Sequence, residues 1–98
     1  MFDIARYENQ LVEEAEKYRE KRIEEIEESI DRDLEFWEEK YTLKIDEEGR
    51  LFGAARDAHI AKAVKDEKAE SMAVAVAELD AEIKKDIAEK LAAAETEE

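Results

Sequence analysis

The apolar residues of the first 41 positions recur at intervals of three, four and four residues, a repeat of eleven. The positions that follow this pattern are Met1, Ile4, Val12, Ala15, Ile23, Ile26, Ile30, Leu34, Trp37 and Tyr41. Residues 3–40 contain neither Gly nor Pro. An eleven-residue repeat corresponds to about 3.67 residues per turn, close to the natural period of an α-helix. The pattern therefore predicts one long N-terminal helix with a nearly straight apolar stripe, interrupted only at Glu8 and Arg19.

The pattern changes in residues 41–52, which begin with an alternation of apolar and polar residues. Thr42 and Ile45 are β-branched, and Asp46 and Gly49 are residues typical of a tight turn. These features predict a short β-hairpin, and an irregular loop between two helices is the alternative.

A second helical arm is predicted for residues 54–94, which again lack Gly and Pro. Its apolar positions do not join cleanly across residues 65–71, so the helix either kinks there or ends and restarts with Asp66 or Ser71 as its N-cap. Residues 95–98 are expected to form a frayed acidic tail. The sequence thus predicts a single, mainly α-helical domain over residues 1–94, in which the two arms pack antiparallel.

The apolar stripes of the two arms are thin, and one hairpin covers only part of them. A dimer that closes into a helical bundle would bury more of this surface, so we expect a homodimer. The residues predicted to mediate self-association are Val12, Ile23, Ile26, Ile30, Leu34, Trp37, Met72, Val76, Leu79, Ile83, Ile87 and Leu91.

The composition narrows the range of functions. The chain of 98 residues has 30 acidic and 16 basic residues, a formal net charge of -14 and no Cys. This charge repels nucleic acid and anionic lipid, and the lack of Cys fits a reducing compartment. No apolar run approaches the ~20 residues of a membrane span. We therefore expect a cytoplasmic protein that does not bind nucleic acid directly and does not bind a membrane.

The acidic residues concentrate in the second half of the first helix. Residues 1–22 hold six acids and five bases, whereas residues 23–39 hold nine acids and one base. Like charges at i,i+4 spacing and acids near a helix C-terminus weaken the helix, and such a conflict often marks a functional surface. We expect this region to bind a basic protein surface. The predicted contact residues are Glu24, Glu25, Glu28, Asp31, Glu35, Phe36, Glu39, Asp46, Glu47 and Glu48.

Residues suited to catalysis or metal binding are few. His59 is the only histidine, and the position three before it is not acidic, unlike in a carboxylate-bridged metal site. We expect a structural or surface role for it. Two carboxylate pairs, Glu13 with Glu16 and Glu28 with Asp31, have a spacing that could hold Mg²⁺, but both pairs lie on one helix. No catalytic residue, cofactor site or metal site is predicted.

Three functions are compatible with these features. The charge distribution favours a non-enzymatic acidic inhibitor or adaptor that binds a basic surface, such as one that normally holds nucleic acid. Phage-encoded anti-CRISPR proteins and other DNA mimics often share this size and charge. The second is a structural coiled-coil assembly protein, in which the apolar stripe is functional and the acidic face is only solvated. The third is a carboxylate metal-dependent nucleotide hydrolase.

Overall fold

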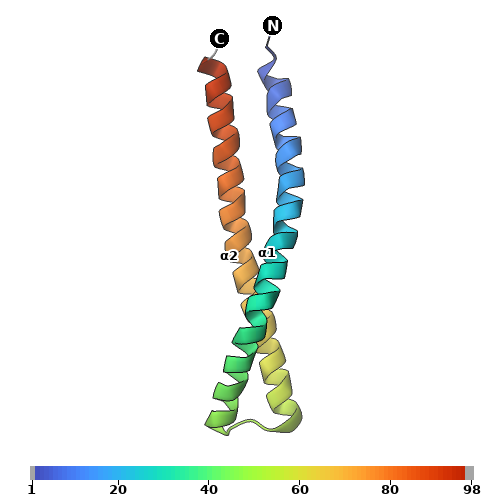
Figure 1. The fold of residues 1–98 in the computed structure, drawn as a ribbon, viewed down its shortest axis with the longest axis vertical. Coiled ribbons are helices and arrows are strands. Elements are labelled where there is room, and N and C mark those ends of the chain that lie inside the picture. Colours follow the sequence, from blue (N-terminus) through green and yellow to red (C-terminus); the bar gives the residue numbers. More distant parts are fainter. Residues whose placement is uncertain (1, 97–98) are drawn as a thin grey trace. The chain divides into compact units, whose positions relative to one another are not determined.

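The computed structural model describes residues 2–96, which form two long α-helices joined by a short turn (Figure 1). Helix α1 spans Ile4–Glu48 and helix α2 spans Gly53–Thr96. The backbone N–H of Arg6 donates a hydrogen bond to Asp3 Oδ1 at 3.3 Å, so Asp3 caps the start of α1. The two helices pack against each other as a helical hairpin, which confirms the predicted mainly α-helical class with two antiparallel arms.

The chain divides into two compact units, each built from one segment of α1 and one segment of α2. The terminal unit contains, of the described residues, 2–24 and 75–96, and the turn unit contains residues 25–74. Each unit therefore has its own pair of packed helical segments.

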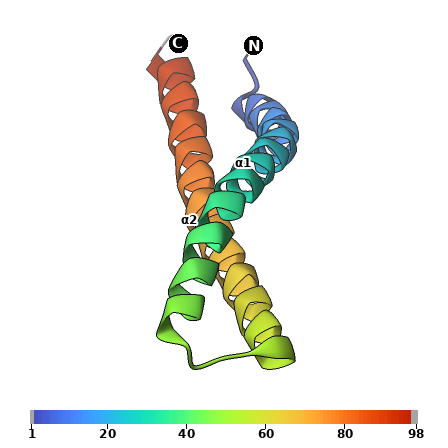
Figure 2. The ribbon, with the colours of Figure 1, turned by 60° about the horizontal axis from the view of Figure 1, so that its bottom comes forward.

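The β-hairpin predicted for residues 41–52 is wrong, because α1 continues to Glu48 and residues 2–96 contain no strand. Tyr41 and Ile45 lie one helical turn apart and both face α2. The apparent alternation of apolar and polar residues therefore comes from one face of a helix. Gly49 ends the helix with φ 65°, and its N–H donates to the carbonyl of Ile45 at 3.3 Å. Residues 49–52 then cross from the end of α1 to the start of α2 (Figure 2).

Helix α2 runs without a break through residues 65–71, so neither Asp66 nor Ser71 starts a new helix. The apolar pattern is interrupted there because Glu67, Lys68 and Ser71 occupy the packed face and are half-buried. Lys68 Nζ lies 2.9 Å from Asp31 Oδ1 of α1, which gives the inward lysine an acidic partner. At the other end, α2 includes residues 95 and 96 of the predicted tail, and residues 97–98 lie outside the described part of the chain.

The predicted eleven-residue stripe is correct in the turn unit. Its members there face α2, at positions 26, 30, 34, 37 and 41. In the terminal unit the stripe is only partly correct: Ala15 and Ile23 are half-buried on the packed face, and Met1 lies outside the described residues. Ile4 and Val12 are exposed, whereas Tyr7, Leu11 and Arg19 face inward with Ala15 at intervals of four residues. The pattern failed here because the inward residues recur every four positions and not in the eleven-residue repeat, and one of them, Arg19, is charged and pairs with Asp80 of α2.

The hydrophobic core is thin. Five apolar residues are buried, with 3–8% of their surface exposed, and no residue among 2–96 is completely enclosed. The five are Leu11, Leu34, Ile45, Ile60 and Leu79. Two helices alone enclose a side chain on only part of its surface, so most of the apolar stripe stays half-exposed.

Candidate interaction surface

The acidic charge of the turn unit lies almost entirely on α1. We call residues 25–48 of α1 the acidic arm; it contains eleven acidic and three basic residues. The facing segment of α2, residues 53–74, contains four acidic and four basic residues. The turn unit is therefore strongly polarised, with one negative helix beside one helix of zero net charge.

Two of the predicted contact residues bind α2 across the turn unit. Asp31 forms the ion pair with Lys68 described above, and Asp46 accepts two hydrogen bonds from Arg56, at 2.8 and 2.9 Å. Hydrogen bonding to Arg56 lowers the pKa of Asp46, and Asp46 together with Asp57 raises the pKa of Arg56. These two carboxylates hold the helices of the hairpin together and are only partly available to a partner.

The remaining predicted acidic contacts are exposed to solvent. They are Glu24, Glu25, Glu28, Glu35, Glu39, Glu47 and Glu48. All but Glu24 belong to the acidic arm, and Glu24 is the last α1 residue of the terminal unit. Exposed carboxylates on one helix produce a negative potential along that side of the turn unit.

Two large apolar side chains stand in this negative field. Phe36 is 69% exposed and Leu43 is 63% exposed. They are seven residues apart, which places them two turns apart on the same side of α1, away from the packed face. An open hollow of about 720 Å³ beside Leu43 is lined by Glu35, Glu38 and Glu39 together with Thr42. Acidic and apolar groups thus share one outward surface of the acidic arm.

Phe36 was predicted to be an exposed contact, and Leu43 was missed. The sequence suggested a strand at residues 41–45, in which Leu43 had no assigned role. In the helix that forms instead, its spacing from Phe36 is the signal that would have found it. Phe52 in the turn and Val74 on α2 are the other two large apolar side chains that this unit exposes.

A column of aromatic rings joins the helices close to the turn. The rings of Trp37 and Tyr41 stack with centroids 4.8 Å apart and planes 9° apart, and the ring of His59 stacks on Tyr41 at 6.0 Å. Tyr41 Oη and His59 Nε2 are 2.9 Å apart and share a hydrogen bond. His59 therefore links α2 to α1 within the turn unit. Among residues 2–96, no three His, Asp or Glu side chains are grouped closely enough to hold a metal ion.

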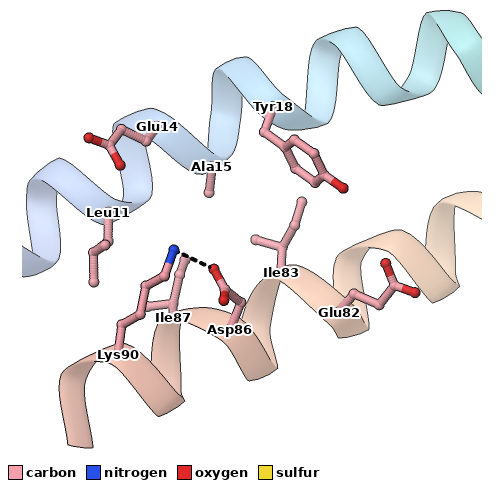
Figure 3. Close-up of a pocket in the computed structure, with 9 residues that line it drawn as sticks. All are labelled: Leu11, Glu14, Ala15, Tyr18, Glu82, Ile83, Asp86, Ile87 and Lys90. Carbon is pink, nitrogen blue, oxygen red and sulfur yellow. Dashed lines mark ion pairs between the residues drawn. The ribbon is translucent and has the colours of Figure 1, made fainter. Parts of the chain in front are cut away.

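The terminal unit has a different surface, a groove between its two helical segments (Figure 3). The groove has a volume of about 480 Å³. Leu11, Ala15 and Tyr18 point into it from α1, and Ile83 and Ile87 point into it from α2. Its charged lining residues are Glu14, Glu82, Asp86 and Lys90, of which Lys90 Nζ lies 2.9 Å from Asp86 Oδ2.

The residues predicted to mediate self-association mostly lie on the packed faces of the hairpin. Leu34 and Leu79 are buried between the helices and Val12 is exposed. The half-buried members of the set are Ile23, Ile26, Ile30, Trp37, Met72, Val76, Ile83, Ile87 and Leu91. Ile83 and Ile87 line the groove of the terminal unit, together with four α1 residues that were not in the predicted set.

No family model, curated protein or solved structure matches this chain. Within residues 2–96, neither helix has a stretch long and apolar enough to cross a membrane.

Proposed function

We propose that this chain is a non-enzymatic, acidic interaction protein of the cytoplasm. It binds a basic surface of a protein partner as an inhibitor or adaptor, acts as a homodimer, and binds neither nucleic acid nor membrane directly. The observation that carries the proposal is the exposure of Phe36 and Leu43 among the carboxylates of the acidic arm.

The chemistry of this surface defines the partner. A surface that covers Phe36 and Leu43 removes apolar area from water, and large aromatic side chains often dominate binding energy. The surrounding carboxylates favour Lys and Arg around the apolar contact, accelerate association and select the partner. A nucleic acid would be repelled by the same carboxylates. The best fit is a protein surface with an apolar recess and a basic rim.

Capture from an extract of the source cells, with the chain immobilised, tests this proposal. The parent should retain a basic protein at low salt and lose most of it in 0.5 M salt, because the Debye length falls to about 4–5 Å, between its values at 0.1 M and 1 M. The double variant Phe36→Ser/Leu43→Ser should lose the same protein. Val74→Ser is the matched control, since Val74 is also exposed but lies on the neutral α2 segment of the turn unit. Equal capture by all three chains would overturn the proposal.

The inhibitor form of the proposal has a sharper test. If the partner's basic surface normally holds nucleic acid, double-stranded DNA should compete with the chain for the purified partner. The competition should be reciprocal, because both ligands would occupy one surface. If added DNA does not reduce binding between the chain and the partner, the chain is better described as an adaptor than as a DNA mimic.

A structural assembly protein is the second candidate, and the thin core favours it. Most apolar residues on the packed faces are only half-buried, so the hairpin has apolar surface left to cover. Salt separates the two candidates. Binding of a basic partner by the acidic arm weakens strongly with salt, whereas assembly that is driven mainly by burial of apolar surface is much less sensitive to it.

A further inference from the structure

We infer that a second copy of this chain packs into the groove of the terminal unit, in a two-fold dimer that sets α1 of each copy beside α2 of the other. This deepens the homodimer part of the proposed function and does not depend on the basic partner. The inference rests on the groove, on the area left exposed and on the charges that border the groove.

The groove offers an apolar surface that one chain leaves open. Ala15, Ile83 and Ile87 are half-buried, and Tyr18 is 50% exposed at its edge. A second pair of helices over these side chains would complete a four-helix arrangement. The chain exposes 7847 Å², which is about 2,000 Å² more than the ~5,800 Å² expected for a compact protein of this mass. This excess exceeds the ~800 Å² per partner of a standard interface.

The ion pair between Arg19 and Asp80 fixes which residues lie at the same level along the two segments. Arg19 Nε is 2.7 Å from Asp80 Oδ1, and Arg19 Nη2 is 3.4 Å from Asp80 Oδ2. Because the helices are antiparallel and have equal rise, each step up α1 from Arg19 matches one step down α2 from Asp80. Lys17 is therefore level with Glu82, and Lys21 is level with Glu78.

The charged residues at these levels border the groove. On α1, Lys17 and Lys21 lie on the side of the groove residue Glu14, because they follow it by three and seven residues. On α2, the groove residue Glu82 shares its side with two neighbours along the helix, Glu78 and Lys85. All of these side chains are exposed in a single copy.

A two-fold axis along the helices brings these two borders together. Such an axis places two grooves face to face and sets α1 beside α2 of the other copy. Rotation about it does not change the position of a residue along the axis, so residues that are level within one copy are also level between the copies. Lys17 then meets Glu82, Lys21 meets Glu78, and Glu14 meets Lys85. Each of these opposite-charge pairs occurs twice. Asp86 and Lys90, the other charged residues of the groove, form an ion pair within one copy. The border charges are therefore complementary to a second copy in this arrangement, whereas an axis perpendicular to the helices does not keep the levels.

Reciprocal charge reversal tests this arrangement. Lys17→Glu/Lys21→Glu makes the α1 border negative, and Glu78→Lys/Glu82→Lys makes the α2 border positive. Either variant alone should dimerise about tenfold or more weakly than the parent, because like charges then face each other. An equimolar mixture should dimerise again, because each variant complements the other on both sides. Sedimentation equilibrium from low to high micromolar concentration measures the dimerisation, and native mass spectrometry identifies the mixed dimer.

Two variants in the turn unit serve as charge-matched controls. Lys62→Glu/Lys65→Glu changes the net charge as the first variant does, and Asp66→Lys/Glu70→Lys changes it as the second does. All four residues are exposed on α2, so both controls should dimerise as the parent does and helical circular dichroism should be unchanged throughout. A monomeric parent, or a mixture no more dimeric than its components, would overturn the inference. The acidic arm is intact in the border variants, so partner capture by them reports on the proposed function separately.

Discussion

The turn unit and the terminal unit are made of the same two helices, yet they differ in how their helices are joined and in what they leave open. In the turn unit, two ion pairs and an aromatic column tie α1 to α2, and three of the five buried side chains lie there. Two of its exposed apolar side chains, Phe36 and Leu43, are on the outside of α1. In the terminal unit, the Arg19–Asp80 pair joins the helices beside an open apolar groove.

This difference follows from the spacing of the inward residues. In the terminal unit the inward positions of α1 recur every four residues, at 7, 11, 15, 19 and 23, and those of α2 include 79, 83, 87 and 91. Residues four apart lie about 40° apart around a helix of 3.6 residues per turn, so a row with this spacing winds around the helix. A straight partner helix covers only part of such a row. A groove is therefore an expected consequence of this spacing, and it leaves a surface that another chain can use.

The largest expected effect is on the core of the terminal unit, where Leu79 is 3% exposed and only Leu11 is also buried. Leu79→Ala should lower the free energy of unfolding by about 2–4 kcal/mol, because the cavity has few neighbours that could close it. Urea denaturation followed by circular dichroism measures the loss. Val74→Ala, at an exposed position, should change stability by less than about 0.5 kcal/mol. Similar losses for the two variants would show that the terminal unit is not packed around Leu79.

The next effect concerns the turn that closes the turn unit. Gly49 has φ 65°, and a Cβ atom there would contact nothing within 4 Å. Gly49→Ala should therefore destabilise the hairpin by the conformational penalty alone, about 1–2 kcal/mol. Gly49→Asn should recover part of this loss, because Asn tolerates the left-handed region better than Ala does. Urea denaturation of the two variants makes the comparison, and an unchanged Ala variant would mean that this residue is not left-handed.

A smaller effect separates the acidic arm from the neutral segment beside it. Glu24, Glu28 and Glu35 take part in four like-charge i,i+4 pairs and one favourable pair with Arg32. Their replacement by Gln should raise the free energy of unfolding by about 0.5–1.5 kcal/mol at low salt. The gain should shrink in 0.5 M salt. Glu70→Gln on the neutral segment is the control and should give no comparable gain. A less stable triple variant would mean that these carboxylates make favourable contacts within the hairpin.

Partner association provides the second measurement on the same triple variant. If the acidic arm is the contact surface, the association rate with a captured partner should fall, and 0.5 M salt should have the same effect on the parent. A triple variant that binds as fast as the parent would reduce the acidic arm to a solvated face and favour the assembly function.

The sequence predicted both helices, because long stretches without Gly or Pro and with regular apolar spacing are strong local signals. It could not predict where a charged residue faces inward. Arg19 and Lys68 interrupt the apolar pattern, but their partners Asp80 and Asp31 lie on the opposite helix, far away in the sequence. Contacts of this kind exist only after the helices have packed, and they explain the inward position of Arg19 in the terminal unit and the false break in α2.

The candidate surfaces were predictable to different degrees. Acidic density is a property of the sequence, so the region around residues 23–48 stood out directly. The outward position of Leu43 depended on whether residues 41–45 form a strand or a helix, a choice that their short alternation left ambiguous. The groove of the terminal unit depends on how two distant segments cross, and neither segment alone contains that information.

The smallest expected effect tests the ion pairs that distinguish the turn unit. Hydrogen bonding to Arg56 lowers the pKa of Asp46 in the folded chain. A carboxyl group with a folded pKa below its unfolded value stabilises the fold above the unfolded pKa, about 3.9 for Asp. That contribution is lost as the pH falls through the lower, folded value. Arg56→Met should therefore be less stable than the parent at pH 7, and the difference in free energy of unfolding between the two should shrink as the pH falls below about 4.

Low pH also protonates the other carboxylates and relieves the repulsion among them. Both chains share this effect, so it cancels when their free energies of unfolding are compared at the same pH. Lys62→Met removes one positive charge from an exposed position on the same helix. Its difference in free energy of unfolding from the parent should not shrink at low pH. Urea denaturation from pH 7 to pH 2 measures all three chains. A difference between parent and Arg56→Met that stays constant down to pH 2 would show that Arg56 stabilises the turn unit through its packing and not through the Asp46 carboxylate.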